Sequence, residues 1–394
     1  MGPRSYFVLL LVIGGVGLRA QAPAADSVPQ KDLVDFFVKL FHIKLSDSTR
    51  NKKSIIFSLV PAAPVNLGQK QAVVSSLNMA FYAGNHATTN LSSIYFVPYT
   101  NFSDRSGFIV TPNVWLSNNE WNLIGDLRLS ANQNYTYGVG GNTTEDTRDE
   151  VDNNYIRGYL TVNRKIWGPV YAGVGYNYDY YYNIKDTYTN DSPSVFSKYG
   201  IGTGPSSTSS GVTFNLLLDD RKNSLNPARG LYSSVVLRFN PSFLPNDNSW
   251  SSLYFDTRKY FSLSELKHSI LGFWLLYWGC YGDVPYFNLP GTGLDASGRT
   301  GRGYVLGRYR GKQMIYGETE YRFDISRNGL WGGVVFANVQ DYKELSSGEF
   351  AYLLPAAGTG LRIKFNKRSG VNLTLDFAVG KNSFNWYLNL GEFF

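Results

Sequence analysis

The sequence predicts an all-β protein: a transmembrane antiparallel β-barrel of about sixteen strands, with a short N-terminal periplasmic helix. Three observations lead to this fold class. An export signal comes first, segments of period-2 hydrophobicity fill most of the remainder, and the connections between them alternate in length. Charged residues make up 17% of the 394 residues and aromatic residues 16%, with 29 tyrosines. A polar lumen and aromatic girdles at the membrane surfaces produce such a composition.

The first residues have the pattern of a secretory signal peptide. Arg4 precedes an apolar run from Tyr6 to Leu18, and small residues follow around Ala20. A basic region, a short apolar region and a small-residue cleavage site predict a signal peptide over residues 1–20. No other stretch supplies the ~20 consecutive apolar residues of a membrane-spanning helix. We therefore expect an exported chain.

Residues 21–53 form a separate periplasmic N-terminal segment. Within it, Lys31–Leu45 has apolar residues at helical spacing, which predicts a short amphipathic helix. Three roles fit this helix: an arm packed against the barrel, a plug in the lumen, or a dock for a periplasmic partner. We favour the arm.

The barrel domain covers residues 54–394, where period-2 alternation continues throughout. In Trp121–Ala131, for example, apolar residues alternate with Asn122, Asp126 and Arg128. Most segments have the ~9–11 residues that a tilted transmembrane strand needs. The predicted strands are Ser54–Pro61, Lys70–Tyr82, Leu91–Tyr99, Gly107–Leu116, Trp121–Ala131, Tyr155–Trp167, Val170–Tyr182, Gly211–Asp219, Gly230–Phe239, Ser251–Phe261, His268–Gly279, Ile315–Ile325, Leu330–Gln340, Gly358–Phe365, Val371–Val379 and Phe384–Phe394.

The connections alternate between two sets along the chain, and the two sets differ in length. The short set is Ala83–Asn90, Ser117–Glu120, Gly168–Pro169, Asp220–Arg229, Ser262–Lys267, Ser326–Gly329 and Asn366–Gly370. The other set contains the long ones, Asn132–Asn154, Asn183–Ser210, Cys280–Met314 and Asp341–Ala357. Long outer loops and short periplasmic turns are typical of outer-membrane barrels. This pattern predicts a bacterial outer-membrane location, with outer-membrane lipid around the barrel.

The last strand alternates aromatic and apolar residues up to the final phenylalanine. The alternating positions of this barrel-closing terminal strand are Phe384, Trp386, Leu388, Leu390 and Phe394. A strand of this kind is the address that the barrel-assembly machinery reads.

Three motifs in the second half of the chain resemble one protein family. They are the turn Asp219–Gly230, the loop sequence Gly301-Arg302-Gly303-Tyr304, and Gly358–Arg362 followed by the aromatic last strand. In this order, over roughly residues 211–394, they resemble the barrel of the bacterial surface antigen superfamily, the BamA/TamA-like outer-membrane proteins.

The resemblance implies a latch inside the lumen. Arg302, followed by Gly303 and Tyr304, would point inward from a long loop and pair with Glu320 of the following strand, with Glu318 as the nearby alternative. A guanidinium and a carboxylate form a strong, directional pair in a confined lumen. Where the family tends to have an aspartate on the next strand, this sequence has Asn338. The resemblance therefore implies one carboxylate partner fewer.

The resemblance also implies a role in outer-membrane biogenesis or in protein export and insertion, with periplasmic or client proteins as partners. Only about 33 residues separate the signal peptide from the first strand, too few for a periplasmic POTRA domain. We therefore expect a short member without such domains. The alternative is a passive channel or transporter, because a sixteen-stranded barrel can enclose an aqueous lumen.

Other function classes find little support in the sequence. The histidines are His42, His86 and His268, and no motif places a nucleophile beside them, so we expect no enzyme and no catalytic residues. No Cys/His spacing predicts a metal site, and we expect no cofactor. The single cysteine, Cys280, excludes an internal disulfide. Basic residues do not cluster, so we expect no nucleic-acid partner.

Overall fold

The computed structural model describes residues 30–33, 55–67, 70–187, 193–264, 269–367 and 369–394. The predicted signal peptide, residues 1–20, and the predicted helix beyond Leu33 lie outside these residues. Within the described ranges, no helix has the length and apolar character to cross a membrane.

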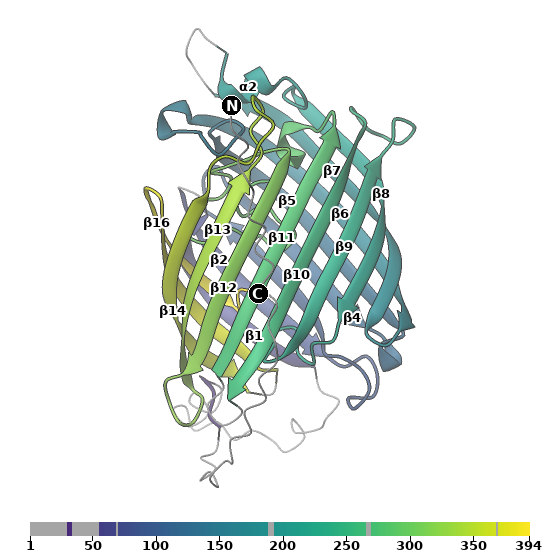
Figure 1. Cartoon of the computed structure of the whole chain (residues 1–394), viewed down its shortest axis with the longest axis vertical. Coiled ribbons are helices and arrows are strands. Elements are labelled where there is room, and N and C mark those ends of the chain that lie inside the picture. The colour runs from purple at the N-terminus through teal and green to yellow at the C-terminus, as the bar shows by residue number, and fades with distance from the viewer. Residues whose placement is uncertain (1–29, 34–54, 68–69, 188–192, 265–268, 368) are drawn as a thin grey trace, which may run out of the picture.

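The strands form one antiparallel sheet in which each pairs with its neighbours in the sequence, and the sheet curls into a barrel (Figure 1). The strands are β1 (Ile56–Leu67), β2 (Lys70–Phe81), β3 (Ser92–Thr100), β4 (Ser106–Trp115), β5 (Trp121–Thr136), β6 (Asp149–Trp167), β7 (Val170–Asp186), β8 (Ser206–Asp219), β9 (Gly230–Asn240), β10 (Trp250–Ser264), β11 (Ser269–Gly282), β12 (Gln313–Asp324), β13 (Trp331–Tyr342), β14 (Leu354–Asn366), β15 (Val371–Gly380) and β16 (Ser383–Leu390). The connections contain α2 (Val195–Tyr199), η2 (Ser117–Asn119), η3 (Glu145–Thr147) and η4 (Tyr286–Asn288). The predicted all-β antiparallel barrel is confirmed.

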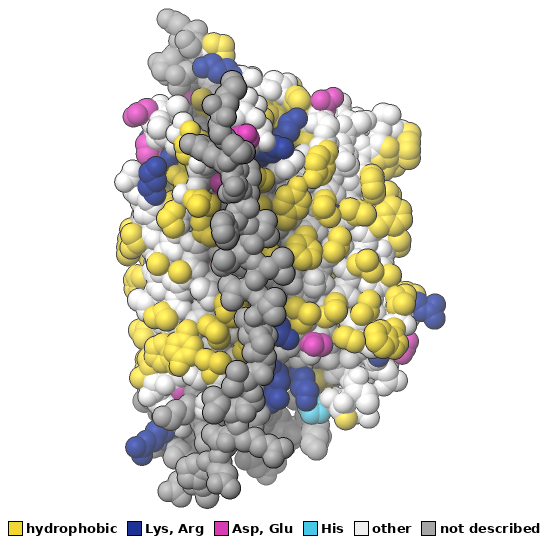
Figure 2. Space-filling view, in the orientation of Figure 1, with side chains coloured by type: hydrophobic (Ala, Val, Ile, Leu, Met, Phe, Trp, Pro, Cys, Tyr) yellow, Lys and Arg dark blue, Asp and Glu magenta, His cyan; other side chains and the backbone are white. Residues whose placement is uncertain are grey.

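Successive side chains along a strand point to opposite sides of the barrel wall. On β12, Tyr316, Glu318, Glu320 and Arg322 are buried, and the residues between them are partly exposed. Large apolar side chains lie exposed on the outer surface of the strands, as Figure 2 shows. A charged interior and an apolar exterior are the two sides of a transmembrane barrel, because only the exterior meets lipid.

The connection lengths differ between the two ends of the barrel, as the sequence predicts. One end has turns such as residues 116–120, 168–169 and 325–330, and the other has residues 137–148, 187–205 and 283–312. The predicted boundaries of the outer loops are wrong, because strands continue into them. The β5–β6 ladder, for example, runs on to the pair Thr136 and Asp149. Backbone groups keep pairing there without an apolar alternation in the side chains.

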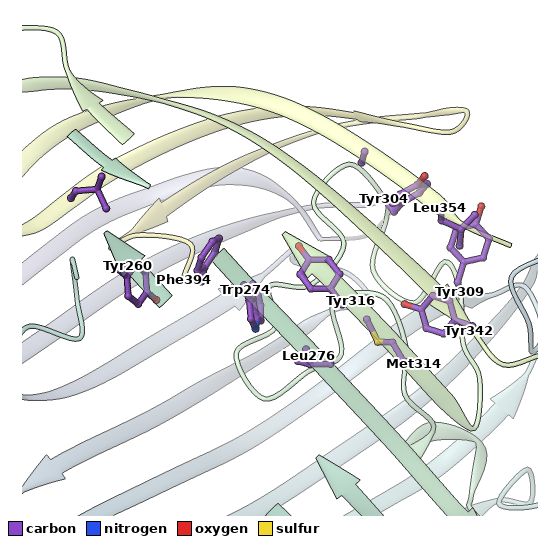
Figure 3. Close-up of a cluster of buried hydrophobic side chains, with 12 residues drawn as sticks. Tyr260, Trp274, Leu276, Tyr304, Tyr309, Met314, Tyr316, Tyr342, Leu354 and Phe394 are labelled. Carbon is purple, nitrogen blue, oxygen red and sulfur yellow. The ribbon is translucent and has the colours of Figure 1, made fainter. Parts of the chain in front are cut away.

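The connection between β11 and β12, residues 283–312, folds into the barrel; we call it the lumen loop. Its Tyr304 and Tyr309 belong to a buried cluster with Trp274, Tyr316 and other wall residues (Figure 3). Its first part packs Tyr286 and Leu289 against a second cluster on β6, β7 and β11. Apolar and aromatic contacts with both sides of the wall therefore hold this loop inside the lumen.

The described part of the N-terminal segment lies at the end with short turns. The Lys31 amide donates to the carbonyl of Asn328 at 3.1 Å, in the β12–β13 turn. The amide of Lys367, in the β14–β15 turn, donates to the carboxylate of Asp32 at 2.9 Å. These contacts place Lys31 and Asp32 beside the β12–β13 and β14–β15 turns.

Candidate functional site

A tight turn of the lumen loop brings Arg302 to the inner wall. Gly301 and Gly303 have φ angles of +73° and +107°, a region that favours glycine. A Cβ atom on Gly303 would lie 2.7 Å from the Cβ atom of Ala356, so a side chain here would clash with β14. The two glycines thus allow the close approach that buries Arg302, which is 1% exposed.

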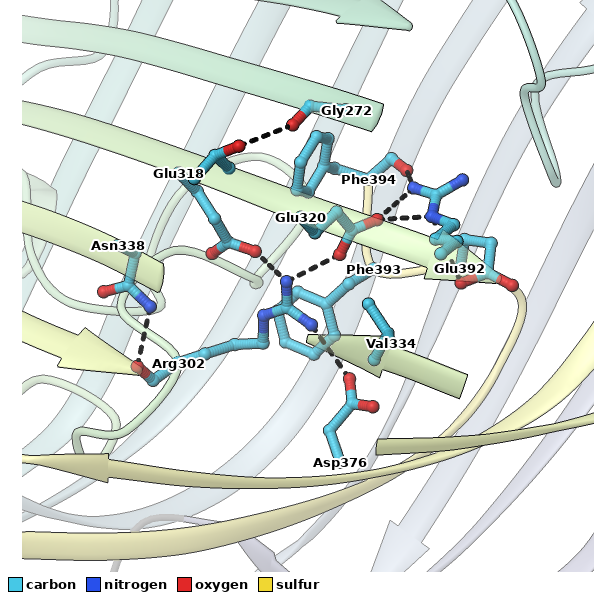
Figure 4. A network of polar contacts seen from close by, with 12 residues as sticks. Gly272, Arg302, Glu318, Glu320, Val334, Asn338, Asp376, Glu392, Phe393 and Phe394 are labelled. Carbon is cyan, nitrogen blue, oxygen red and sulfur yellow. Dashed lines mark hydrogen bonds and ion pairs between the residues drawn. The ribbon is translucent and has the colours of Figure 1, made fainter. Parts of the chain in front are cut away.

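Arg302 contacts three carboxylates on two strands (Figure 4). Its Nη2 atom lies 2.7 Å from Oε2 of Glu320 and also contacts Oε1 of Glu318, both on β12. Its Nη1 atom lies 2.9 Å from Oδ2 of Asp376 on β15. All four side chains are fully buried. The planar guanidinium therefore fixes the loop to two separate parts of the wall.

Two aromatic rings enclose the guanidinium from its faces. The Cζ atom of Arg302 lies 3.6 Å from the ring centroid of Phe336 on β13 and 4.1 Å from that of Phe393, which follows β16. A desolvated cation–π contact contributes about 2 kcal/mol or more. The rings also exclude water from the ion pairs, which strengthens each of them.

Polar contacts fix the loop backbone on either side of Arg302. Asn338 donates through Nδ2 to the Arg302 carbonyl at 2.9 Å, and the Gly303 amide donates to the Tyr387 hydroxyl at 2.9 Å. The Tyr304 hydroxyl donates to the Pro355 carbonyl at 2.7 Å. The loop is therefore bound to β13, β14 and β16 as well as to the carboxylates.

The position of Asn338 offers Arg302 no carboxylate, and the one that Asp376 offers was not foreseen from the sequence. Asn338 binds the loop backbone, as described, and Asp376 supplies a third carboxylate from β15. Asp376 is the only charged residue of Val371–Gly380. An isolated charge in an apolar strand was the sequence signal for this residue.

Two further arginines, Arg362 and Arg322, enlarge the network of ion pairs around Arg302. Arg362 Nη1 lies 2.5 Å from Oδ1 of Asp376, and its Nε lies 2.8 Å from Oε2 of Glu392. Arg322 contacts Glu320, and its Nε lies 3.6 Å from the same Glu392 oxygen. Three guanidinium groups therefore face four carboxylates, a formal balance of three positive and four negative charges.

Glu392 lies beyond the last strand and stays ionised in this setting. Burial disfavours its charge, but the guanidinium groups of Arg362 and Arg322 outweigh burial and lower the pKa of its carboxyl to about 2. The amide of Asn372 adds a hydrogen bond of 2.5 Å to the other carboxylate oxygen. Glu392 is therefore a permanent anion in the lumen at neutral pH.

The predicted closing strand is partly corrected by the structure. Phe384 is 62% exposed on the outside, and Trp386 and Leu388 follow it along β16. Leu390 ends β16 and is buried. The assignment of Phe394 to this strand is wrong. The chain turns inward at Gly391, whose φ angle is +98°, and Phe394 is buried in the lumen.

The Asp219–Gly230 turn closes one side of the barrel's short-turn end. Arg221 and Asp219 pair at 2.8 Å. The amide of Asn223 donates to the carbonyl of Ser369 at 2.9 Å, and that of Asn226 to the carbonyl of Gly370 at 3.1 Å. This turn thus binds the β14–β15 turn across the lumen and fixes the end of the barrel.

The residues considered for catalysis lie apart from this site. Cys280 is buried in the cluster around Tyr286, and His86 packs against the ring of Tyr82. His42 and His268 lie outside the described residues. Within the part of the chain that the structure covers, no group of three or more His, Cys, Asp or Glu is placed to hold a metal ion.

Comparisons with known proteins support the fold. No family model matches the chain, and no curated protein matches its sequence. The structure of BamA from Haemophilus ducreyi lacking POTRA domains 1–3 is similar, with a TM-score of 0.50 and 13% identity, covering 86% of this chain and 69% of that one. CdiB from Acinetobacter baumannii is similar at a TM-score of 0.50 and 12% identity, covering 86% of this chain and 65% of that one. The chain has a BamA-like barrel fold and spans about two thirds of these structures.

Proposed function

We propose that this chain is a BamA/TamA-like outer-membrane barrel that acts in outer-membrane biogenesis or in protein export and insertion. Its partners on this proposal are outer-membrane lipid and client or periplasmic proteins. The chain contributes a strand edge and a latched loop, and the proposal assigns it no catalytic step. The barrel fold, its apolar exterior and the Arg302 latch support the proposal.

The observation that carries the proposal is the seam between β1 and β16. These strands lie beside each other, yet among the described residues no backbone ladder joins them, whereas every consecutive pair from β1 to β16 has one. The β1–β2 register shifts between Val60 and Ala63, next to Pro61, which lacks an amide proton. Unpaired backbone groups in lipid cost several kcal/mol each, so this edge favours pairing with a strand from another chain.

The lumen loop weakens the alternative of a passive channel. Its side chains pack against both sides of the wall, and Arg302 fixes it between β12 and β15. Ions would pass freely only after this loop moved. A channel therefore predicts a loop that leaves the lumen readily.

The proposal is tested by crosslinking at the seam in native membranes. A photo-crosslinking residue at Leu59 of β1 is expected to capture other exported chains, identified by mass spectrometry. The matched control is Val236 of β9, which pairs with neighbours on both sides. Capture at both positions, or at neither, would contradict the proposal. A large, stable conductance of the unmodified barrel in planar bilayers, unchanged by deletion of residues 283–312, would favour the channel.

A further inference from the structure

The last four residues, Gly391–Phe394, cross the lumen instead of following β16; we call them the tail. The Gly391 amide makes the final ladder bond to the Asn372 carbonyl at 2.7 Å, and the chain then turns inward. A Cβ atom on Gly391 would lie 2.9 Å from the hydroxyl of Tyr95 in a left-handed backbone conformation. Glycine therefore makes the inward turn possible.

The tail residues Glu392 and Phe393 meet arginines of the barrel wall and of the lumen loop. The Glu392 carboxylate binds Arg362 and Arg322, and the carbonyl of Phe393 accepts a hydrogen bond from Nη1 of Arg299 at 2.9 Å. The Phe393 ring lies against Arg302. All three tail side chains are 3–4% exposed. The tail therefore lies in a buried site whose charged groups pair with its own.

The ring of Phe394 ends the tail in an aromatic slot on the opposite wall. It lies 5.3 Å from the ring of Trp274 on β11 and 6.1 Å from that of Tyr260 on β10, as centroid distances (Figure 3). A Cβ atom on Gly272 would lie 3.3 Å from this ring, so glycine leaves room for it. Arg322 also donates to the carbonyl of Phe394. The tail thus reaches from β16 to β10.

Figure 4 shows the tail and the latch as one network. Phe393 forms one face of the Arg302 sandwich, and Glu392 binds Arg362, which shares Asp376 with Arg302. The tail is covalently joined to β16, the strand at the seam. Any movement of β16 away from β1 that pulls the tail outward removes a ring from Arg302 and a carboxylate from Arg362.

We propose that the tail is a strap that couples the position of β16 to the lumen loop. With the tail docked, the loop is latched and the seam strand is held; with the tail withdrawn, both are released together. The use of this coupling in opening the seam rests on the proposed function, but the coupling itself does not. Coupling between two sites is reciprocal, so weakening the latch must also loosen the tail.

The test is trypsin cleavage of the purified, folded full chain in detergent. The loop carries Arg299, Arg308 and Arg310, and the tail is required to protect them. We expect Phe393→Ala to accelerate cleavage in the loop at least about tenfold, since protection follows the population of the open form. Phe384→Ala, on the outer face of β16, is the control and should leave the cleavage rate unchanged. An unchanged rate in Phe393→Ala would overturn the proposal.

A double-mutant cycle separates coupling from general weakening. Arg302→Ala and Phe393→Ala are combined, and the cleavage rate at Arg308 is measured in all four proteins. If the two residues are coupled, the double variant should be cleaved at least about threefold more slowly than the product of the two single-variant rate increases predicts. Rate increases that simply multiply in the double variant would overturn the proposal. If either alanine variant does not fold, Phe393→Leu and Arg302→Lys replace them. No client protein enters the measurement, so its outcome is independent of crosslinking at the seam.

Discussion

The two sides of the lumen use charged residues in different ways. Around the lumen loop, Arg302 connects a loop to β12 and β15, and its four-membered ion group is fully buried. On β5, Arg128 binds Asp126 two residues away on the same strand, and the two side chains are 19% and 12% exposed. The first group thus joins the lumen loop to strands up to 74 residues away. The second joins the neighbouring strands β5 and β6 through Arg157, with one longer hydrogen bond of 3.3 Å from Arg128 to the Ala296 carbonyl of the lumen loop. Connectivity and burial, rather than the number of ion pairs, decide how much each contributes.

The largest effect is expected from Arg302→Ala. Removing one partner from a buried ionic network leaves uncompensated charges and costs about 3–5 kcal/mol. The barrel should show a much lower temperature for its heat-induced mobility shift on electrophoresis. Arg302→Lys should recover part of the loss, because lysine keeps the charge without the planar fork. Equal stability of the alanine variant and the unmodified barrel would show that the latch does not contribute to the stability of the barrel.

A smaller loss is expected from Asp376→Asn. The substitution keeps the shape but removes the charge shared by Arg302 and Arg362, which costs about 1–3 kcal/mol. Thermal unfolding followed by circular dichroism measures the loss. The control is Asp256→Asn, whose partner Arg258 lies two residues away on the same strand. A larger loss in the control would reverse the comparison between the two sides.

Acid should weaken the latch side through Glu392. Its pKa falls from the usual 4.5 to about 2 in the folded barrel, so its ionised form contributes stability that is fully present above about pH 4.5. This contribution is lost as the pH falls from about 4.5 through about 2. Glu392→Gln should therefore be less stable at neutral pH and lose less on acidification. Parallel stability curves for the two proteins between these pH values would contradict the assignment.

The smallest effect is expected from Arg128→Gln on the other side of the lumen. A partly exposed ion pair contributes about 1 kcal/mol or less, and Asp126 retains Arg157 as a partner at 2.8 Å. The heat-induced mobility shift should move only slightly. A loss comparable to that of Arg302→Ala would mean that burial does not separate the two sides.

Much of the candidate site was visible in the sequence, and the rest was hidden for physical reasons. Arg302, Glu318 and Glu320 were found because the loop motif resembles that of a known family, which implies a pairing with the strand that follows, and 18 residues or fewer separate them. Asp376 lies 74 residues from Arg302, and its inward position is visible from alternation, but its partner is not. Phe393 and Glu392 were missed because the predicted strand was extended to Phe394, although Glu392 interrupts the apolar positions and the strand ends at Leu390.

The sequence by itself determined the all-β class, the inward and outward faces of the strands and the end with short turns. These follow from period-2 alternation and from turn composition, which are local properties. Only the tertiary structure decided which inward residues meet. Strand register and the path of the lumen loop bring β12, β15 and the tail together around Arg302. The inward turn at Gly391 is also a tertiary outcome, because its stabilisation comes from arginines on β12, β14 and the loop.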